Sequence, residues 1–313
     1  MKIACIFPGF GSQYVGMAKE VYDNQRVVQE YFEEAYNCLD TNFVKLCFAS
    51  SDEEISTLEN SYLGLFLANS SLFALLKESG ISPDWVAGYG MGAYSALYSA
   101  GAFTFPDGLY LIKKLDSFYK EYLENNPLKA VCITNLERQE LEEFVIHSNC
   151  EISTYRSIDT HYVLGEPKDV ESLKKALAKS SAKVKDAAIE NCLNSQRFTE
   201  VADSFKIYLE KVDFKNLKLP YCSSFNRDIS SGETIKKEVV TQISMPNKWA
   251  SVMKRLKNFD LIIEVGPGTV LKDLVSAHYP ELNVVSFNKS SDIEKIKTLV
   301  GINAGDTDGS AAE

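Results

Sequence analysis

The sequence has few of the residues that build metal centres and disulfide frameworks. Its 313 residues include three histidines, at unrelated spacings, and seven scattered cysteines with no CxxC pair. Such a distribution fits buried free thiols in a reducing compartment better than a disulfide framework or a metal cluster. We therefore expect a cytoplasmic protein with no metal site and no cofactor.

Positive charge and long apolar runs are also lacking. The net charge is −10 and the isoelectric point is near 5.0, whereas nonspecific nucleic-acid binding needs a positive surface. No stretch approaches the roughly 20 apolar residues of a membrane span. The first residues, "MKIACIFPGF", lack the length of a signal-peptide core. The expected partners therefore include neither nucleic acid nor membrane.

The remaining pattern is that of an α/β protein. A hydrophobic content of 45% is ordinary for a soluble globular chain. Short apolar strands such as "KIACIFPG", "WVAGYG" and "FDLIIEVGPG" alternate with helical stretches such as "TLENSYLGLFLANSSLFALLKESG". This alternation predicts a large, hydrolase-like domain with a parallel sheet, formed by residues 1–127 and 191–300.

A second pattern interrupts the first near Leu128. From "KAVCITN" to "AKVKDAAI" the segments follow the order β-α-β-β-α-β, which is typical of a ferredoxin-like unit. The sequence thus predicts an inserted ferredoxin-like α+β subdomain over residues 128–190. The polar stretch at 301–313 is expected to be a flexible tail.

A glycine-rich turn follows the strand "WVAGYG". The stretch Gly88-Tyr89-Gly90-Met91-Gly92 keeps the spacing of a nucleophile elbow, G-x-S-x-G, but has glycine at the nucleophile position. The simplest interpretation is that Gly90 relieves strain in a turn that needs an unusual φ. The turn then persists without the chemistry.

Five stretches, in order, together resemble one family. They are "IFPGFGSQYVGMAKEVY", "AGYGMGAYSALYSAGAFTFPDGLYLI", "EISTYRSIDTHYVLGEPKDVESL", "SMPNKWASVM" and "EVGPGTVLKDLV". The family comprises malonyl-CoA:acyl carrier protein transacylases and the acyltransferase domains of fatty acid and polyketide synthases. Its members are similar to this chain from about Lys2 to about Phe287.

The resemblance implies which positions would carry chemistry. In the family an elbow serine attacks the thioester, a histidine takes its proton and an arginine pairs with the malonyl carboxylate. Here these positions are Gly90, Asn194 and Leu115. Two backbone N–H groups, one after the elbow serine and one from a loop glutamine, hold the oxyanion in the family, and the glutamine position is Phe10. The expected pocket or ligand-binding residues are Phe10, Gln13, Tyr89, Gly90, Met91, Leu115, Arg156, Asn194, Gly266 and Gly268.

These replacements indicate that no catalytic set is intact. Glycine offers no nucleophile, and the amide of Asn194 does not titrate at neutral pH. Leu115 cannot form the bidentate pair that an arginine forms with a carboxylate. The leading hypothesis is a noncatalytic acyltransferase homologue of fatty acid or polyketide biosynthesis. It would bind an acyl carrier protein, an acyl group or acyl-CoA, or a synthase partner protein.

The second hypothesis is that the chain is an active enzyme. A rebuilt site around Tyr89, Cys192 or Arg156 would serve an active acyltransferase or thioesterase acting on an uncharged acyl-CoA or acyl-carrier substrate. The first hypothesis predicts no covalent labelling by acyl-CoA. The second predicts a mass increase on one residue or release of free CoA, so fold analogy alone does not decide whether the chain is an enzyme.

Overall fold

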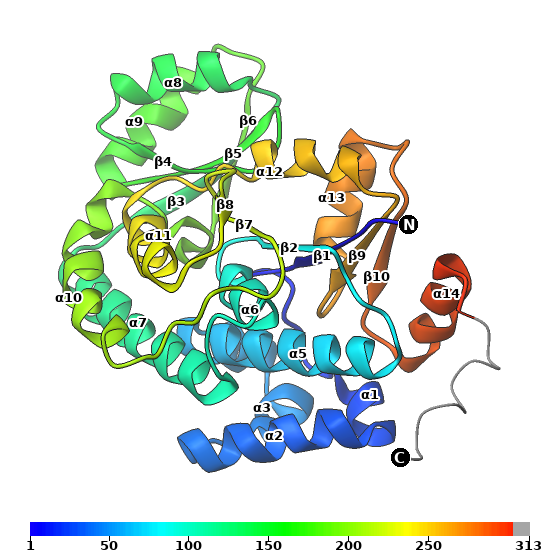
Figure 1. Ribbon diagram of the computed structural model, residues 1–313. Coiled ribbons are helices and arrows are strands. Elements are labelled where there is room, and N and C mark those ends of the chain that lie inside the picture. Colours follow the sequence, from blue (N-terminus) through cyan, green and yellow to red (C-terminus); the bar gives the residue numbers. More distant parts are fainter. Residues whose placement is uncertain (303–313) are drawn as a thin grey trace, which may run out of the picture.

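The computed structural model describes residues 1–302 and contains two sheets (Figure 1). The larger sheet has the strand order β10-β9-β1-β2-β7-β8. Its strands are parallel except for β8, which pairs antiparallel with β7. The strands are β1 (Ile3–Phe7), β2 (Trp85–Gly88), β7 (Tyr221–Cys222), β8 (Asp228–Ile229), β9 (Leu261–Val265) and β10 (Val284–Phe287).

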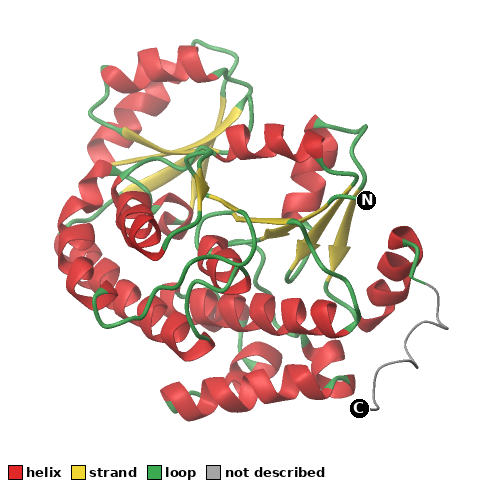
Figure 2. Cartoon of the chain, viewed as in Figure 1, coloured by secondary structure: helices red, strands yellow, loops and turns green. Residues whose placement is uncertain are grey.

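Helices cover both faces of this sheet (Figure 2). Along β1, Cys5 and Phe7 belong to a core shared with α5 and α6, whereas Ala4 and Ile6 pack with Trp249 and the helices on the opposite face. This alternation follows from the two-residue period of a strand. The helices are α1 (Lys19–Asn24), α2 (Arg26–Leu39), α3 (Phe43–Ala49), α4 (Asp52–Ile55), α5 (Leu58–Glu78), α6 (Gly92–Ser99), α7 (Phe105–Asn125), α10 (Thr199–Leu209), α11 (Gly232–Ser244), α12 (Trp249–Arg255), α13 (Val270–His278) and α14 (Ser290–Val300).

The smaller sheet has the order β4-β5-β3-β6, and its neighbouring strands are antiparallel. Its elements are β3 (Lys129–Thr134), α8 (Arg138–Ile146), β4 (Glu151–Tyr155), β5 (Thr160–Gly165), α9 (Pro167–Leu177) and β6 (Lys183–Ala187). A separate core that includes Val131, Val163 and Leu173 lies between the sheet and the two helices. The expected combination of a parallel-sheet α/β domain and a ferredoxin-like unit is confirmed.

Short 3-10 turns connect the two parts near the predicted boundary. They are η1 (Ile189–Cys192) and η2 (Gln196–Phe198), while η3 (Leu256–Asn258) follows α12. The strands of the smaller sheet begin at Lys129 and end at Ala187, inside the range 128–190 that the sequence assigns to the subdomain.

Three details differ from the sequence expectations. Strand β10 and helix α14 are not predicted, because "VVSF" is short and borders polar loops. The apolar stretch "LPYCSSF" predicts a longer strand than the two residues of β7. A turn follows, in which Ser223 donates its N–H to the carbonyl of Arg227 and Asn226 has a φ of 63°. Of the predicted tail, Gly301 caps α14, and 303–313 lie outside the described residues.

Candidate functional site

The glycine turn between β2 and α6 brings three backbone segments close together. A Cβ on Gly88 would lie 2.1 Å from the carbonyl carbon of Gly92, and one on Gly92 would lie 2.2 Å from the carbonyl oxygen of Phe7. These two glycines are therefore required by packing. Gly90 differs, because its φ is +55° but a Cβ there would have no heavy atom within 4 Å. The turn therefore has space for a side chain at position 90, where the sequence has glycine.

This contrast predicts different costs for two alanine variants. Gly88→Ala is expected to lower the free energy of unfolding by about 3 kcal/mol or more, because backbone atoms cannot move away. Gly90→Ala is expected to cost only about 1–2 kcal/mol, the penalty of a left-handed conformation. Urea unfolding of both variants measures the difference. Equal losses would contradict the assignment of Gly90 to an open position.

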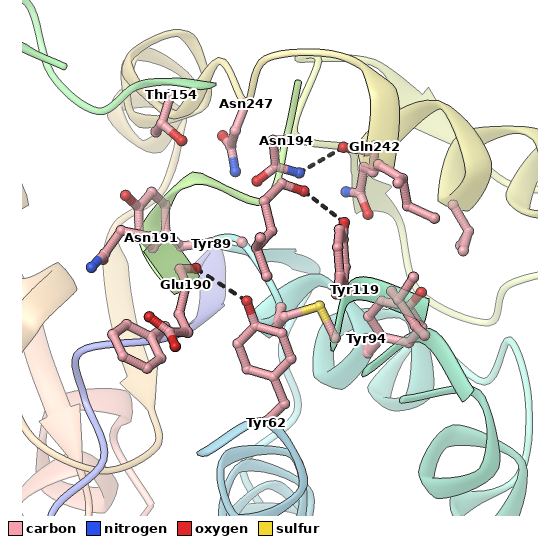
Figure 3. A pocket seen from close by; sticks show the side chains of 17 residues that line it. Tyr62, Tyr89, Tyr94, Tyr119, Thr154, Glu190, Asn191, Asn194, Gln242 and Asn247 are labelled. Carbon is pink, nitrogen blue, oxygen red and sulfur yellow. Dashed lines mark hydrogen bonds between the residues drawn. The ribbon is translucent and has the colours of Figure 1, made fainter. Parts of the chain in front are cut away.

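A small cavity lies beside the elbow (Figure 3). Its volume is about 30 Å³, which is room for little more than one water molecule. Segments from α5, α7, α11 and the turn η1 surround it. The residues that line it are Phe10, Tyr62, Tyr89, Gly90, Met91, Tyr94, Leu115, Tyr119, Thr154, Glu190, Asn191, Leu193, Asn194, Val239, Gln242, Ile243 and Asn247.

Six of the ten residues singled out from the sequence meet at this cavity. They are Phe10, Tyr89, Gly90, Met91, Leu115 and Asn194. Tyr89 packs edge-on against Trp249, with ring centroids 5.4 Å apart, and Leu115 is 1% exposed. Large apolar and aromatic groups therefore occupy much of the space beside the elbow.

The other four residues do not line the cavity. Gln13 accepts a hydrogen bond from the N–H of Gly11 at 2.7 Å. Arg156 points one guanidinium nitrogen at the hydroxyl of Tyr162, 3.4 Å away. Each side chain therefore contacts protein groups rather than the cavity.

Gly266 and Gly268, also outside the lining, shape the turn after β9. A Cβ on Gly266 would lie 2.2 Å from the side-chain oxygen of Asn69. Gly268 has a φ of +75°, and its carbonyl accepts a hydrogen bond from the amide of Asn288 at 2.9 Å. Close packing and backbone conformation account for both glycines without a ligand.

Two residues that line the cavity, Phe10 and Met91, have backbone N–H groups without a protein acceptor. Neither group donates a hydrogen bond to another residue within 1–302. These are the positions that the family resemblance assigns to oxyanion binding.

Several lining residues were missed from the sequence. Tyr62 of α5 donates its hydroxyl to the carbonyl of Glu190 at 3.1 Å, and Tyr119 of α7 donates to the carbonyl of Leu193 at 2.6 Å (Figure 3). These two bonds fix the chain around η1 against two helices. No local pattern distinguishes these tyrosines from core residues, because both lie on long, largely buried helices.

The cavity carries no positive side chain. Its lining includes no lysine, arginine or histidine, and its one carboxyl group belongs to Glu190, whose pKa is raised by burial. Burial also raises the pKa of the phenol of Tyr89. The side-chain amide of Asn194 donates to the carbonyl of Gln242 at 2.6 Å. The lining groups are therefore neutral hydrogen-bonding or apolar groups, apart from one carboxyl group.

Asp116, next to Leu115 on α7, is expected to make the stability of the folded protein depend on pH. It is 4% exposed, its Oδ1 lacks a partner among the described residues, and burial, aided by Glu59, raises the pKa of its carboxyl group to about 7. A folded pKa above the unfolded value means that stability falls as the pH rises through about 4 to 7.

We therefore expect Asp116→Asn to stabilise the protein relative to the parent, by about 2 kcal/mol more at pH 8 than at pH 5. Urea unfolding at both pH values measures this difference. Glu121→Gln, an exposed change on the same helix, is the control that removes one carboxylate. A pH-independent effect of Asp116→Asn would contradict the prediction.

The comparisons with known proteins agree with this geometry. Residues 4–308 match the family model described as acyl transferase domain. A malonyl CoA-acyl carrier protein transacylase from Bacillus subtilis (strain 168) is 29% identical over 309 residues, covering 95% of this chain and 97% of the relative. The chain therefore belongs to the acyl transferase domain family, and the resemblance expected from the sequence is confirmed.

Solved structures share the fold. An acyl carrier protein S-malonyltransferase from Vibrio cholerae superposes with a TM-score of 0.91 at 21% identity, covering 95% of this chain and 100% of the other. A malonyl-transacylase in complex with its type II polyketide synthase acyl-carrier protein superposes at 0.90 with 23% identity, covering 96% and 100%.

Within residues 1–302, every helix is too short or too polar to span a membrane. No group of three or more His, Cys, Asp or Glu side chains in that range is placed to hold a metal ion.

Proposed function

We propose that this chain is a noncatalytic acyl transferase homologue of fatty acid or polyketide assembly, which binds an acyl carrier protein, an acyl group or a partner enzyme without transferring acyl chains. The observation that carries the proposal is the elbow itself. Gly90 adopts a left-handed conformation beside open space, yet presents no nucleophile to the cavity.

The neighbouring groups support the same conclusion. Asn194 stands where the family has its histidine, and its amide is held by the carbonyl of Gln242, so it neither titrates nor points a free base at the elbow. Leu115 stands at the arginine position and is buried. A cavity of about 30 Å³ has room for a group the size of a thioester carbonyl, but not for a malonyl group beyond it.

The rebuilt-site alternative receives less support. Cys192 is fully buried and does not line the cavity, and burial raises the pKa of its thiol. Burial raises the pKa of Tyr89 as well, so both residues are held in their protonated, weakly nucleophilic forms. Arg156 contacts Tyr162 and does not line the cavity. Within residues 1–302, neither Tyr89 nor Cys192 hydrogen-bonds to a side chain that could act as a base.

Binding of a carrier protein draws support from the fold. The malonyl-transacylase solved with its acyl-carrier protein matches this chain over nearly its full length. The unpaired N–H groups of Phe10 and Met91 offer hydrogen bonds to a thioester oxygen. A carrier-borne acyl group would therefore find donors for its carbonyl but no group to attack it.

The test compares binding with acylation. The protein is incubated with labelled malonyl-CoA, acetyl-CoA and a medium-chain acyl-CoA, and its intact mass and the release of free CoA are measured. Calorimetry with apo and acylated carrier protein measures binding in parallel. We expect no mass increase and no CoA release above the buffer blank, together with saturable binding of the carrier.

The Bacillus subtilis relative, treated in the same way, is the positive control. A stable acyl adduct on one residue, or steady release of CoA, would overturn the noncatalytic assignment in favour of a rebuilt site. Absence of carrier binding would overturn the proposed partner.

A further inference from the structure

A second and larger cavity lies between the smaller sheet's subdomain and the helices α12 and α13. Its volume is about 230 Å³, and it shares no lining residue with the cavity at the elbow. One wall comes from α8, β4 and β5 of the smaller sheet's subdomain. The other comes from α12 and the end of α13 (Figure 1).

The charged residues that line this cavity are all basic, although the carboxylates of Glu142 and Asp159 contact lining residues from outside. Arg138, Lys248 and Lys254 line it, and no Asp or Glu does. This is unexpected in a chain with 43 acidic and 33 basic residues. Within residues 1–302, Lys248 and Lys254 form no ion pair, whereas Arg138 pairs with Glu142 at 2.7 Å. Two lysines of the lining, of which Lys254 is solvent-exposed, are therefore not paired with a carboxylate among these residues.

Two histidines, His161 and His278, add hydrogen-bonding groups to the lining. His161 is fully buried, its Nε2–H donates to the carbonyl of Leu136, and burial lowers its pKa. Its Nδ1 has no partner within residues 1–302. The Nε2 of His278 lies 3.5 Å from the carboxylate of Asp159.

Apart from Ser157 and Ser251, the rest of the wall is apolar or aromatic. Tyr155, Ile158, Met253 and Tyr279 contribute to it, and the guanidinium of Arg138 lies 4.4 Å from the ring centroid of Tyr155. An engineered apolar cavity of about 150 Å³ holds benzene. A space of about 230 Å³ therefore suits one ring, or a short chain of similar size, with a charged substituent.

We propose that this cavity binds a small organic anion, a carboxylate or phosphate ester on a body about the size of one aromatic ring. Lys248 and Lys254 pair with the anionic group, and the aromatic wall covers the apolar body. Because the lining comes from both subdomains, the occupant contacts both. The proposal does not depend on whether the elbow is catalytic.

Titration calorimetry of the full chain tests this with four probes: benzoate, phenyl phosphate, inorganic phosphate and neutral benzyl alcohol. We expect benzoate, phenyl phosphate or both to bind saturably, at least about 10-fold tighter than inorganic phosphate and benzyl alcohol. The first two probes distinguish a carboxylate from a phosphate ligand. No saturable anion binding, or benzyl alcohol binding as tightly as either aromatic anion, would overturn the proposal.

Matched variants locate the site. Ile158→Glu places an acid at the cavity and is expected to weaken anion binding by more than 10-fold. Ile146→Glu, on an exposed position of α8, is expected to leave it unchanged. Ile158 and Ile146 are 63% and 78% exposed, so neither change disturbs a core. Lys254→Gln and its control Lys295→Gln on α14 repeat the comparison with a removed charge. Equal effects of a variant and its control would contradict the placement.

Discussion

The Gly90→Ser variant is expected to remain inactive in malonyl transfer to a carrier protein, at least about 1,000-fold below the Bacillus subtilis relative. The position has space for the hydroxymethyl group, since a Cβ there meets no heavy atom within 4 Å. Activity is nevertheless expected to stay low, because Asn194 supplies no base and Leu115 no carboxylate partner. Catalytic groups that act as a unit are strongly non-additive, so restoring one of them recovers little.

Formation of malonyl-carrier protein from labelled malonyl-CoA measures this directly. The double variant Gly90→Ser/Asn194→His is the informative companion, because it returns a nucleophile and a base together. We expect the pair to exceed the single variant by at least about 100-fold in self-acylation with acetyl-CoA. Turnover of Gly90→Ser alone near that of the relative would show that the other two positions do not matter.

Malonyl-CoA is expected to bind no tighter than free CoA. The cavity at the elbow has no basic side chain, and the carboxyl group of Glu190 lines it. Burying a malonate carboxylate without a partner there would cost about 3–5 kcal/mol, which cancels any gain from its methylene group. Calorimetric titration with CoA, acetyl-CoA, a medium-chain acyl-CoA and malonyl-CoA measures the ratio of dissociation constants.

The outcome with malonyl-CoA also tests Arg156. If malonyl-CoA binds clearly tightest, a cation must reach the carboxylate, and Arg156, whose guanidinium is without a carboxylate partner within residues 1–302, is the first candidate. Arg156→Gln would then abolish the preference. In that case the absence of a carboxylate clamp, and with it part of the noncatalytic argument, would be wrong.

The turn between β2 and α6 is predictable from the sequence, because the glycine spacing that marks it is local. The resemblance assigns Asn194 and Leu115 to the same site, and both residues line the cavity beside the turn. The sequence predicts the ferredoxin-like unit because its information is also local, since six short segments follow one another in a recognisable order. The glycines at 266 and 268 belong to the same type of signal, but they serve packing and do not line the cavity.

Sites built from distant segments are not visible in this way. Tyr62 and Glu190 meet at the elbow cavity although they are far apart in the chain, and neither has a sequence pattern of its own. The larger cavity is even less visible in the sequence, because its lining residues Arg138 and Lys254 come from different subdomains. The two histidines of this cavity, at 161 and 278, are too far apart in the sequence to form a recognisable motif. Only the docking of α12 and α13 beside the smaller sheet brings these groups together.

The first and last strands of the smaller subdomain, β3 and β6, are antiparallel neighbours, so the chain enters and leaves this subdomain at the same place. Ala130 and Ala187, at its entry and exit, are register partners on neighbouring strands, so their Cα atoms lie about 5 Å apart. A turn of about two residues spans that gap. An exchange of the whole subdomain would therefore need only two adjacent junctions, and it would replace one wall of the larger cavity while the glycine elbow stays next to the strand that carries it.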